Sequence, residues 1–212
     1  MAKETEIKLV VSDVKAFERK LKKLGGKTVG TGNGRVHEFN TIFDTPDGGL
    51  AKHGQLLRIR AETAQRSGKK AGSARVVLTF KQPTERGIDE AGARFKVRDE
   101  TELEVSDAGP LAKIFEGLGM RGWFRYEKYR TTWKLGASAR WAKDLLIEID
   151  ETPVGTYVEL EGPPEAIDRA AEALGYSRKD YLLKNYLTLY AEDCRRRGVM
   201  PRNMLFAARK TK

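Results

Sequence analysis

Residues 94–105 read Arg-Phe-Lys-Val-Arg-Asp-Glu-Thr-Glu-Leu-Glu-Val and alternate between charged and mainly apolar side chains. This period of two predicts a β-strand over roughly 93–105, because successive side chains of a strand point to opposite faces. One face carries six ionisable groups: Arg94, Lys96, Arg98, Glu100, Glu102 and Glu104. The fold must therefore either expose this charged face to water or enclose it.

Seven further segments show the same strand-like patterning. We predict strands at about 3–11, 35–43, 55–62, 74–82, 123–135, 141–150 and 156–161, with loops at 65–73 and 84–92. Helical periodicity and capping residues predict helices at about 13–24, at 108–118, from Pro163-Pro164 to Gly175, and from Ser177 to about Arg196.

Eight strands in mostly hairpin order can close into an antiparallel barrel, with helices packed outside. The fold class expected is therefore α+β, with an eight-stranded antiparallel β-barrel. A β-sandwich whose charged faces meet water would show similar alternation. The residues alone leave both architectures open.

The chain has 212 residues, which suits a single domain, and a formal net charge of +10. Seven basic and no acidic residues lie in the last eighteen positions, so the remaining residues are nearly balanced (33 − 30 = +3). We therefore predict one domain over 1–196 and a basic C-terminal tail over 197–212. A solvated terminus is the favoured interpretation of this tail, and a nucleic-acid-binding arm is the alternative.

Other classes of protein are disfavoured by composition. A single cysteine, Cys194, excludes an internal disulfide and a multi-cysteine zinc site. No apolar stretch is long enough for a membrane span, and the charged N-terminus lacks the apolar core of a signal peptide, so we expect a cytoplasmic protein without a membrane partner. The sequence leaves a homodimer open.

The charged faces combine groups that suit a metal–polyphosphate complex. Two carboxylates at i and i+2 on a strand lie about 7 Å apart on the same side, and both can reach one Mg²⁺ or Mn²⁺ ion directly or through water. Arginine forks match phosphate oxygens. The Trp123-Phe124-Arg125-Tyr126 run could also stack on bases, but packing of these rings against a helix is the favoured interpretation.

Short motifs along residues 4–190 resemble the CYTH superfamily, the triphosphate tunnel metalloenzymes. The opening Glu4-Thr5-Glu6-Ile7-Lys8 is similar to that family's Glu-x-Glu-x-Lys signature. The other matching segments are Phe43-Asp44-Thr45, Leu56-Leu57-Arg58-Ile59-Arg60, Leu78-Thr79-Phe80-Lys81, the acidic pair Glu100 and Glu102, Lys128-Tyr129-Arg130, Asp150 with Gly155, Glu159-Leu160-Glu161, and Lys184-Asn185-Tyr186.

This resemblance implies a tunnel that binds a triphosphate and Mg²⁺ or Mn²⁺. The metal ligands implied are Glu4, Glu6, Asp150, Glu159 and Glu161, with Glu100 and Glu102 as supporting acids. The phosphate-binding residues implied are Lys8, Arg58, Arg60, Lys81, Lys128, Arg130 and Lys184, of which Lys8, Arg58, Arg60 and Lys81 are the catalytic candidates. Arg94, Lys96 and Arg98 are expected beyond the tunnel mouth.

The family includes inorganic triphosphatases, thiamine triphosphatases and class IV adenylyl cyclases. We expect hydrolysis of a small-molecule triphosphate, because it needs fewer substrate contacts. Cyclisation of ATP to cyclic AMP and pyrophosphate is the first alternative. A non-catalytic polyphosphate- or RNA-binding module is the second, although inward acids would not help it.

Overall fold

The computed structural model describes residues 2–30, 33–65, 74–84 and 94–207. Most of the two predicted loops, at 66–73 and 85–92, and the tail residues 208–212 lie outside the described residues. Among the helices of the described part, none is long and apolar enough to cross a membrane.

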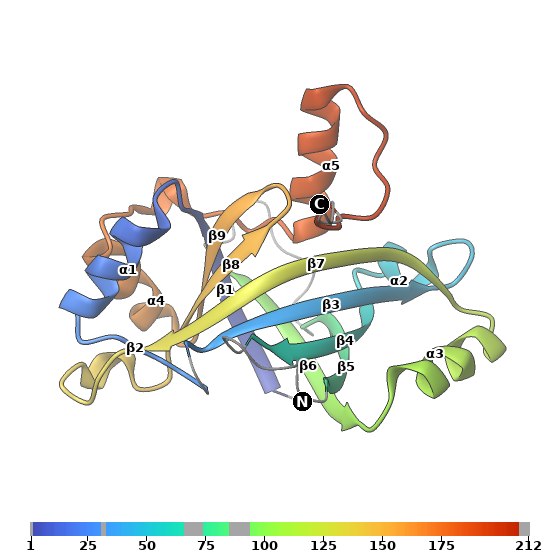
Figure 1. Ribbon diagram of the computed structural model, residues 1–212, viewed down its shortest axis with the longest axis horizontal. Coiled ribbons are helices and arrows are strands. Elements are labelled where there is room, and N and C mark those ends of the chain that lie inside the picture. The colour runs from blue at the N-terminus through green and yellow to red at the C-terminus, as the bar shows by residue number, and fades with distance from the viewer. Residues whose placement is uncertain (1, 31–32, 66–73, 85–93, 208–212) are drawn as a thin grey trace, which may run out of the picture.

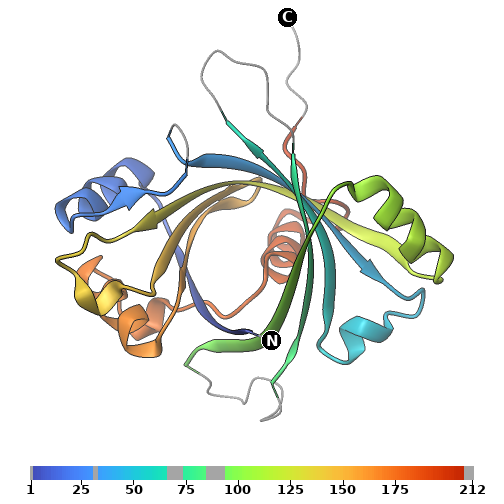
Figure 2. The same ribbon diagram turned by 90° about the horizontal axis from the view of Figure 1, so that it is seen from below.

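Eight long strands form a closed antiparallel barrel, as predicted (Figures 1 and 2). Around the barrel they run β7-β3-β4-β5-β6-β1-β9-β8, and pairing of β8 with β7 closes the ring. The strands are β1 (Ala2–Val10), β3 (Arg35–Asp44), β4 (Leu56–Ala64), β5 (Arg75–Pro83), β6 (Lys96–Val105), β7 (Arg121–Lys134), β8 (Leu146–Thr152) and β9 (Gly155–Glu161). A two-residue strand that the sequence analysis missed, β2 (Lys27–Thr28), extends the sheet at the end of β7.

The apolar faces of the strands point outward, where helices cover them. Ile7 and Leu9 of β1 lie in one buried cluster with Leu21 of α1 (Val14–Lys23) and Ile167 of α4 (Pro164–Ala173). On another side, α3 (Ala108–Gly117) packs Phe115 against Phe43, with ring centroids 5.2 Å apart. Figure 2 shows these helices outside the ring. Because the apolar faces are used outside, the ionised faces are left to line the lumen.

The last helix begins later than predicted. Ser177 and Asp180 do form the expected capping box, but on a single 3₁₀ turn (Arg178–Asp180). The chain then pairs with β1, because Lys8 and Leu182 exchange two backbone hydrogen bonds of 2.9 Å. This pairing breaks the helix, so α5 spans Tyr186–Arg197 and Asn185 caps it.

Two smaller differences lie near other strands. The predicted turn after β3 contains a short helix, α2 (Gly49–Lys52), whose backbone N–H groups at 50 and 51 donate to the carboxylate of Asp44. The strand expected from residue 141 begins at Leu146, because a 3₁₀ turn occupies Arg140–Ala142.

The described residues after α5, 198–207, pack on the barrel through Met204, which differs from a solvated tail. Met204 is buried, and its N–H donates to the carbonyl of Arg125 at 2.9 Å while its carbonyl accepts from Glu127. Together with α5 it covers Phe124 and Tyr126 of β7. This confirms the predicted packing of those two rings. Figure 2 shows α5 through the opening of the barrel.

Candidate active site

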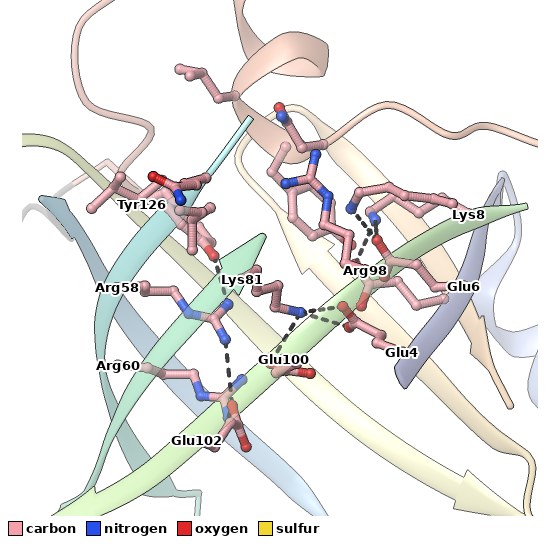
Figure 3. A pocket seen from close by; sticks show the side chains of 18 of the residues that line it. Glu4, Glu6, Lys8, Arg58, Arg60, Lys81, Arg98, Glu100, Glu102 and Tyr126 are labelled. Atoms are coloured by element: carbon pink, nitrogen blue, oxygen red, sulfur yellow. Dashed lines mark hydrogen bonds and ion pairs between the residues drawn. The ribbon is translucent and has the colours of Figure 1, made fainter. Parts of the chain in front are cut away.

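The barrel lumen holds a cavity of about 400 Å³ whose wall is dense in charge. Among the described residues its lining contains eight bases and eight acids. The bases are Lys8, Arg58, Arg60, Lys81, Lys96, Arg98, Lys128 and Arg130, and the acids are Glu4, Glu6, Asp44, Glu100, Glu102, Glu148, Glu159 and Glu161. Figure 3 shows side chains from β1, β4, β5, β6 and β7 meeting across this space. The strand period brings them together, because alternate residues of each strand face inward.

Lys8 and Glu6 form the centre of one buried cluster. Lys8 Nζ lies 3.1 Å from carboxylate oxygens of both Glu6 and Glu159, and Lys96 pairs with Glu6 as well. Burial alone would raise the pKa of Glu6, but Lys8 and Lys96 outweigh it and hold that pKa well below its ordinary value. Burial, with the charge of Lys8, lowers the pKa of Lys96 despite its pairing with Glu6.

A second cluster joins β1, β5 and β6. Lys81 Nζ donates to both carboxylate oxygens of Glu4 at 2.6 Å and lies 3.2 Å from Glu100 (Figure 3). Burial works against the charge of Lys81, but Glu4 outweighs it and raises the lysine pKa. Lys81 is therefore a fixed positive charge at neutral pH.

The two arginines of β4, Arg58 and Arg60, are two residues apart and therefore face the lumen on the same side of the strand. Arg58 donates to the Tyr126 hydroxyl at 3.2 Å and to Thr79 Oγ1 at 3.1 Å, and Arg60 donates to Glu102 at 3.3 Å. Burial raises the pKa of Glu102, but Arg60 and Thr79 outweigh it, so that pKa is lowered. The buried Nε of Arg58 has no hydrogen-bond acceptor within the described part of the chain. An unpaired buried donor on a cation is a hydrogen-bonding capacity that the described residues leave unused.

The third cluster surrounds Asp150, which is completely buried. Its carboxylate accepts from Lys128 at 2.9 Å, from two nitrogens of Arg130 at 2.7 and 2.6 Å, and from the Tyr186 hydroxyl at 2.6 Å. Glu38 lies behind the same bases, with Lys128 Nζ 3.4 Å and Arg130 Nε 3.6 Å from its oxygens. Asp150 therefore orients Lys128 and Arg130, and it does not line the cavity.

Two carboxyl groups in the lining are short of positive charge. Within the described residues Glu161 makes no ion pair, and Glu148 pairs with Arg130, which is shared with Glu38, Asp150 and Glu159. Burial raises the pKa of Glu161 to about 8, and the nearby Glu4 and Glu148 add to the effect. Burial, with Asp150 and Glu159, likewise raises the pKa of Glu148 to about 7, although Arg130 opposes this. A divalent cation would relieve this repulsion, since hard cations prefer carboxylate oxygens.

No three His, Cys, Asp or Glu side chains in the described residues already stand in a metal-binding arrangement. The donor chemistry of Glu148, Glu159 and Glu161 still fits Mg²⁺ or Mn²⁺, which bind through a few carboxylates with waters and phosphate oxygens.

The structure brings most of the predicted site residues into one cavity. The lining includes Glu4, Glu6, Lys8, Arg58, Arg60, Lys81, Glu100, Glu102, Lys128, Arg130, Glu159 and Glu161. Asp150 lies just behind it. Lys184 does not reach the lining, and its half-exposed ammonium donates to Glu192 at 2.7 Å instead. The next three residues, Asn185, Tyr186 and Leu187, do line the cavity, so the Lys184 side chain, and not this stretch of chain as a whole, is directed away from it.

Sequence reasoning missed several participants. Lys96 and Arg98, expected beyond the mouth, line the cavity, because β6 pairs Lys96 with Glu6 and Arg98 with Glu4 of β1. Glu38 was missed although it shares the inward parity of β3, and its position opposite Lys128 depends on strand register. Glu148, within the strand predicted at 141–150, was not singled out.

Comparison with known proteins agrees with this architecture. The CYTH domain model matches residues 2–186, most of the barrel and the start of α5. The chain belongs to the CYTH domain family.

Relatives of this CYTH protein carry cyclase and triphosphatase names. A protein of Methanocaldococcus jannaschii named "Putative adenylate cyclase" is 26% identical over 197 residues, covering 88% of this chain and 97% of the relative. The fold also matches a Vibrio parahaemolyticus structure with the same designation at a TM-score of 0.68 and 16% identity, covering 88% of this chain and 96% of that one. A Hippeastrum structure matches at a TM-score of 0.55 and 22% identity, covering 93% and 97%. Its description reports an adenylyl cyclase candidate with dominant triphosphatase activity.

Proposed function

We propose that the protein is a divalent-metal-dependent enzyme that binds a triphosphate in the barrel and cleaves one of its phosphoanhydride bonds. The observation that carries the proposal is the convergence of buried and partly buried bases from β1, β4, β5 and β7 on one cavity, where the Nε of Arg58 finds no acceptor among the described residues. A triphosphate offers many oxygen acceptors in a row, which matches a line of cations along a tunnel.

The phosphate-binding groups proposed are Lys8, Arg58, Arg60, Lys81, Lys128 and Arg130. Lys184 is left out, because its ammonium pairs with Glu192 away from the cavity. The bound phosphates would take over hydrogen bonds that carboxylates such as Glu4 and Asp150 now accept. Positively charged groups fixed before substrate arrives stabilise the charge that spreads over phosphate oxygens during transfer.

The lining also supports a metal requirement. With eight bases balanced by eight acids, a bare triphosphate of about four negative charges would leave the cavity strongly negative. We propose that Glu159, Glu161 and Glu148, with Glu4 nearby, hold Mg²⁺ or Mn²⁺. The bound ion would neutralise charge on the phosphate oxygens. Glu6 and Asp150, implied as ligands by the resemblance, instead neutralise lysines and Arg130.

Hydrolysis is the reaction we favour. Water attacks the terminal phosphorus, the bond to the bridging oxygen breaks, and one proton is released for each orthophosphate and diphosphate pair formed. Cyclisation is the second candidate, and the name of the Methanocaldococcus jannaschii relative favours it. There the ribose 3′-hydroxyl of ATP attacks the α-phosphorus and pyrophosphate leaves. A non-catalytic polyanion binder is disfavoured, because it would gain nothing from eight acids in the wall, whereas a metal-dependent enzyme needs carboxylates to hold its ion.

Product analysis tests this proposal. The protein would be incubated with inorganic triphosphate, thiamine triphosphate or ATP, with Mg²⁺, Mn²⁺ or a chelator, and the products separated by chromatography. We expect metal-dependent orthophosphate release, and Glu161→Gln is expected to raise the metal concentration needed. Cyclic AMP with pyrophosphate would establish cyclisation instead. Absence of turnover with every substrate and both metals would refute the enzymatic proposal.

A further inference from the structure

The start of β7 contains a β-bulge at Trp123. Ile42 of β3 pairs with Phe124, whereas the next residue, Phe43, pairs with Gly122. One step along β3 therefore spans two steps along β7, and Trp123 is the extra residue. A bulge changes the direction in which a side chain points, and such irregularities are common beside active sites. Without the bulge, simple alternation from the inward-facing Tyr126 would direct Trp123 to the outer face.

The bulge leaves the Trp123 ring at the wall of the same cavity that holds the phosphate-binding bases. The residue is 47% exposed, which is unusual for a large aromatic side chain that lines a cavity. Phe124 packs beside it, with ring centroids 5.9 Å apart, and Phe124 is itself fixed in the buried cluster under α5. The Trp123 ring is therefore held in place by Phe124 and still has surface that a ligand in the cavity could contact.

The lining also contains uncharged groups. Leu56 and Leu187 pack against the buried cluster that holds Phe124, and Gln55 and Asn185 add amides to the wall of the same cavity. Asn185 Oδ1 caps α5, which leaves its amide N–H group for a ligand. Apolar walls with a few amide donors and acceptors are typical of sites for organic ligands. An inorganic triphosphate has no apolar or aromatic part that Trp123, Leu56 and Leu187 could bind, although the amides could donate to its oxygens.

We propose that Trp123 stacks on a flat aromatic group joined to the triphosphate, so that the tunnel prefers a nucleoside triphosphate over inorganic triphosphate. This inference rests on the proposed function, because it assumes that the phosphates occupy the basic part of the cavity. It adds a specificity-determining residue at the organic end of the substrate. Stacking needs no particular base, since every base presents a π-face.

Binding calorimetry with non-hydrolysable, methylene-bridged analogues of ATP and of tripolyphosphate tests the inference, in the presence of Mg²⁺. We expect Trp123→Ala to weaken binding of the ATP analogue by about tenfold, as loss of base stacking does elsewhere. The tripolyphosphate analogue is expected to change by less than about twofold, because its contacts are independent of the ring. Trp123→Phe should retain most of the affinity for the ATP analogue.

Trp141 provides a matched control, since it lies on the outer 3₁₀ turn, with the Arg169 guanidinium 4.7 Å from its ring centre. Trp141→Phe is expected to bind both analogues as the wild type does. Unchanged binding of the ATP analogue by Trp123→Ala, or equal weakening of both analogues, would overturn the inference while leaving the proposed function intact. A wild type that binds neither analogue would refute both.

Discussion

Inside the barrel, nearly every basic side chain is held by a carboxylate on another strand. Lys81 of β5 with Glu4 of β1 and Arg130 of β7 with Asp150 of β8 are examples. A buried charge is costly unless it is paired, so these pairs allow a highly charged lumen to exist without ligand. When a metal–triphosphate complex binds, we expect these ion pairs to break. The lysine and arginine side chains would then donate to phosphate oxygens, and some of the carboxylates would bind the metal ion.

Glu38 illustrates how the charge pairs contribute to stability. Burial alone would raise its pKa, but Lys128 and Arg130 outweigh burial and lower the pKa from 4.5 to about 2. A carboxyl group with a depressed folded-state pKa stabilises the fold above its unfolded pKa. That contribution is lost as the pH falls from about 4.5 toward 2.

We therefore expect Glu38→Gln to lower the free energy of unfolding at pH 7 by about 3 kcal/mol, the equivalent of the pKa shift. The difference between wild type and variant should shrink as the pH falls below 4.5. Urea denaturation at pH values between 7 and 3 measures it. A difference that stays constant over this range would show that the charge of Glu38 is not the stabilising feature.

At the scale of elements, the strands were predictable and their partners were less so. The period of two in residues 94–105 is local information, and it identified the strand and the residues that share its charged face, but not whether that face is enclosed. The positions of Lys96 and Glu38 depend on which strand lies alongside and in what register, which no single segment encodes. The helix expected from Ser177 failed for the same reason, because Leu182 makes long-range hydrogen bonds with Lys8.

Most of the bases that the resemblance implied for phosphate binding do line the cavity, because alternation along β1, β4, β5 and β7 puts them on the inward faces of the strands. Asp150 and Lys184 were placed in contact with ligand by resemblance. The described structure instead buries Asp150 against Lys128 and Arg130, and it pairs Lys184 with Glu192. The role of each of these two residues depends on tertiary contacts.

The segment after α5 behaves as part of the domain, and this can be tested at Met204. Its side chain is 1% exposed, whereas Met200 in the same segment is 84% exposed. Met204→Ala is expected to cost about 2–5 kcal/mol of stability, because it leaves a cavity against Phe124 and α5. Met200→Ala should change stability by less than about 0.5 kcal/mol. Equal, small effects in thermal and urea denaturation would indicate that residues 199–207 are a solvated tail.

At the scale of the whole molecule, the barrel has its charged face inside and its apolar face outside, whereas many barrels have an apolar interior. Helices such as α1 and α4 provide the apolar core outside the ring, and the lumen is free to carry charge. Closure by β7 and β8 leaves no open sheet edge in the ring and encloses the lumen on all sides. A low-dielectric wall around fixed cations strengthens their action on phosphate oxygens.

The central claim is that a triphosphate binds within this ring of bases. Isothermal titration calorimetry of inorganic triphosphate with Mg²⁺ tests it most directly, using wild type, Arg58→Ala and Lys184→Ala. We expect one binding site per barrel, affinity that falls by at least about tenfold in Arg58→Ala through loss of charge-assisted hydrogen bonds, and near-wild-type affinity in Lys184→Ala. Equal affinity in wild type and Arg58→Ala, or no binding by a folded wild type, would contradict the account.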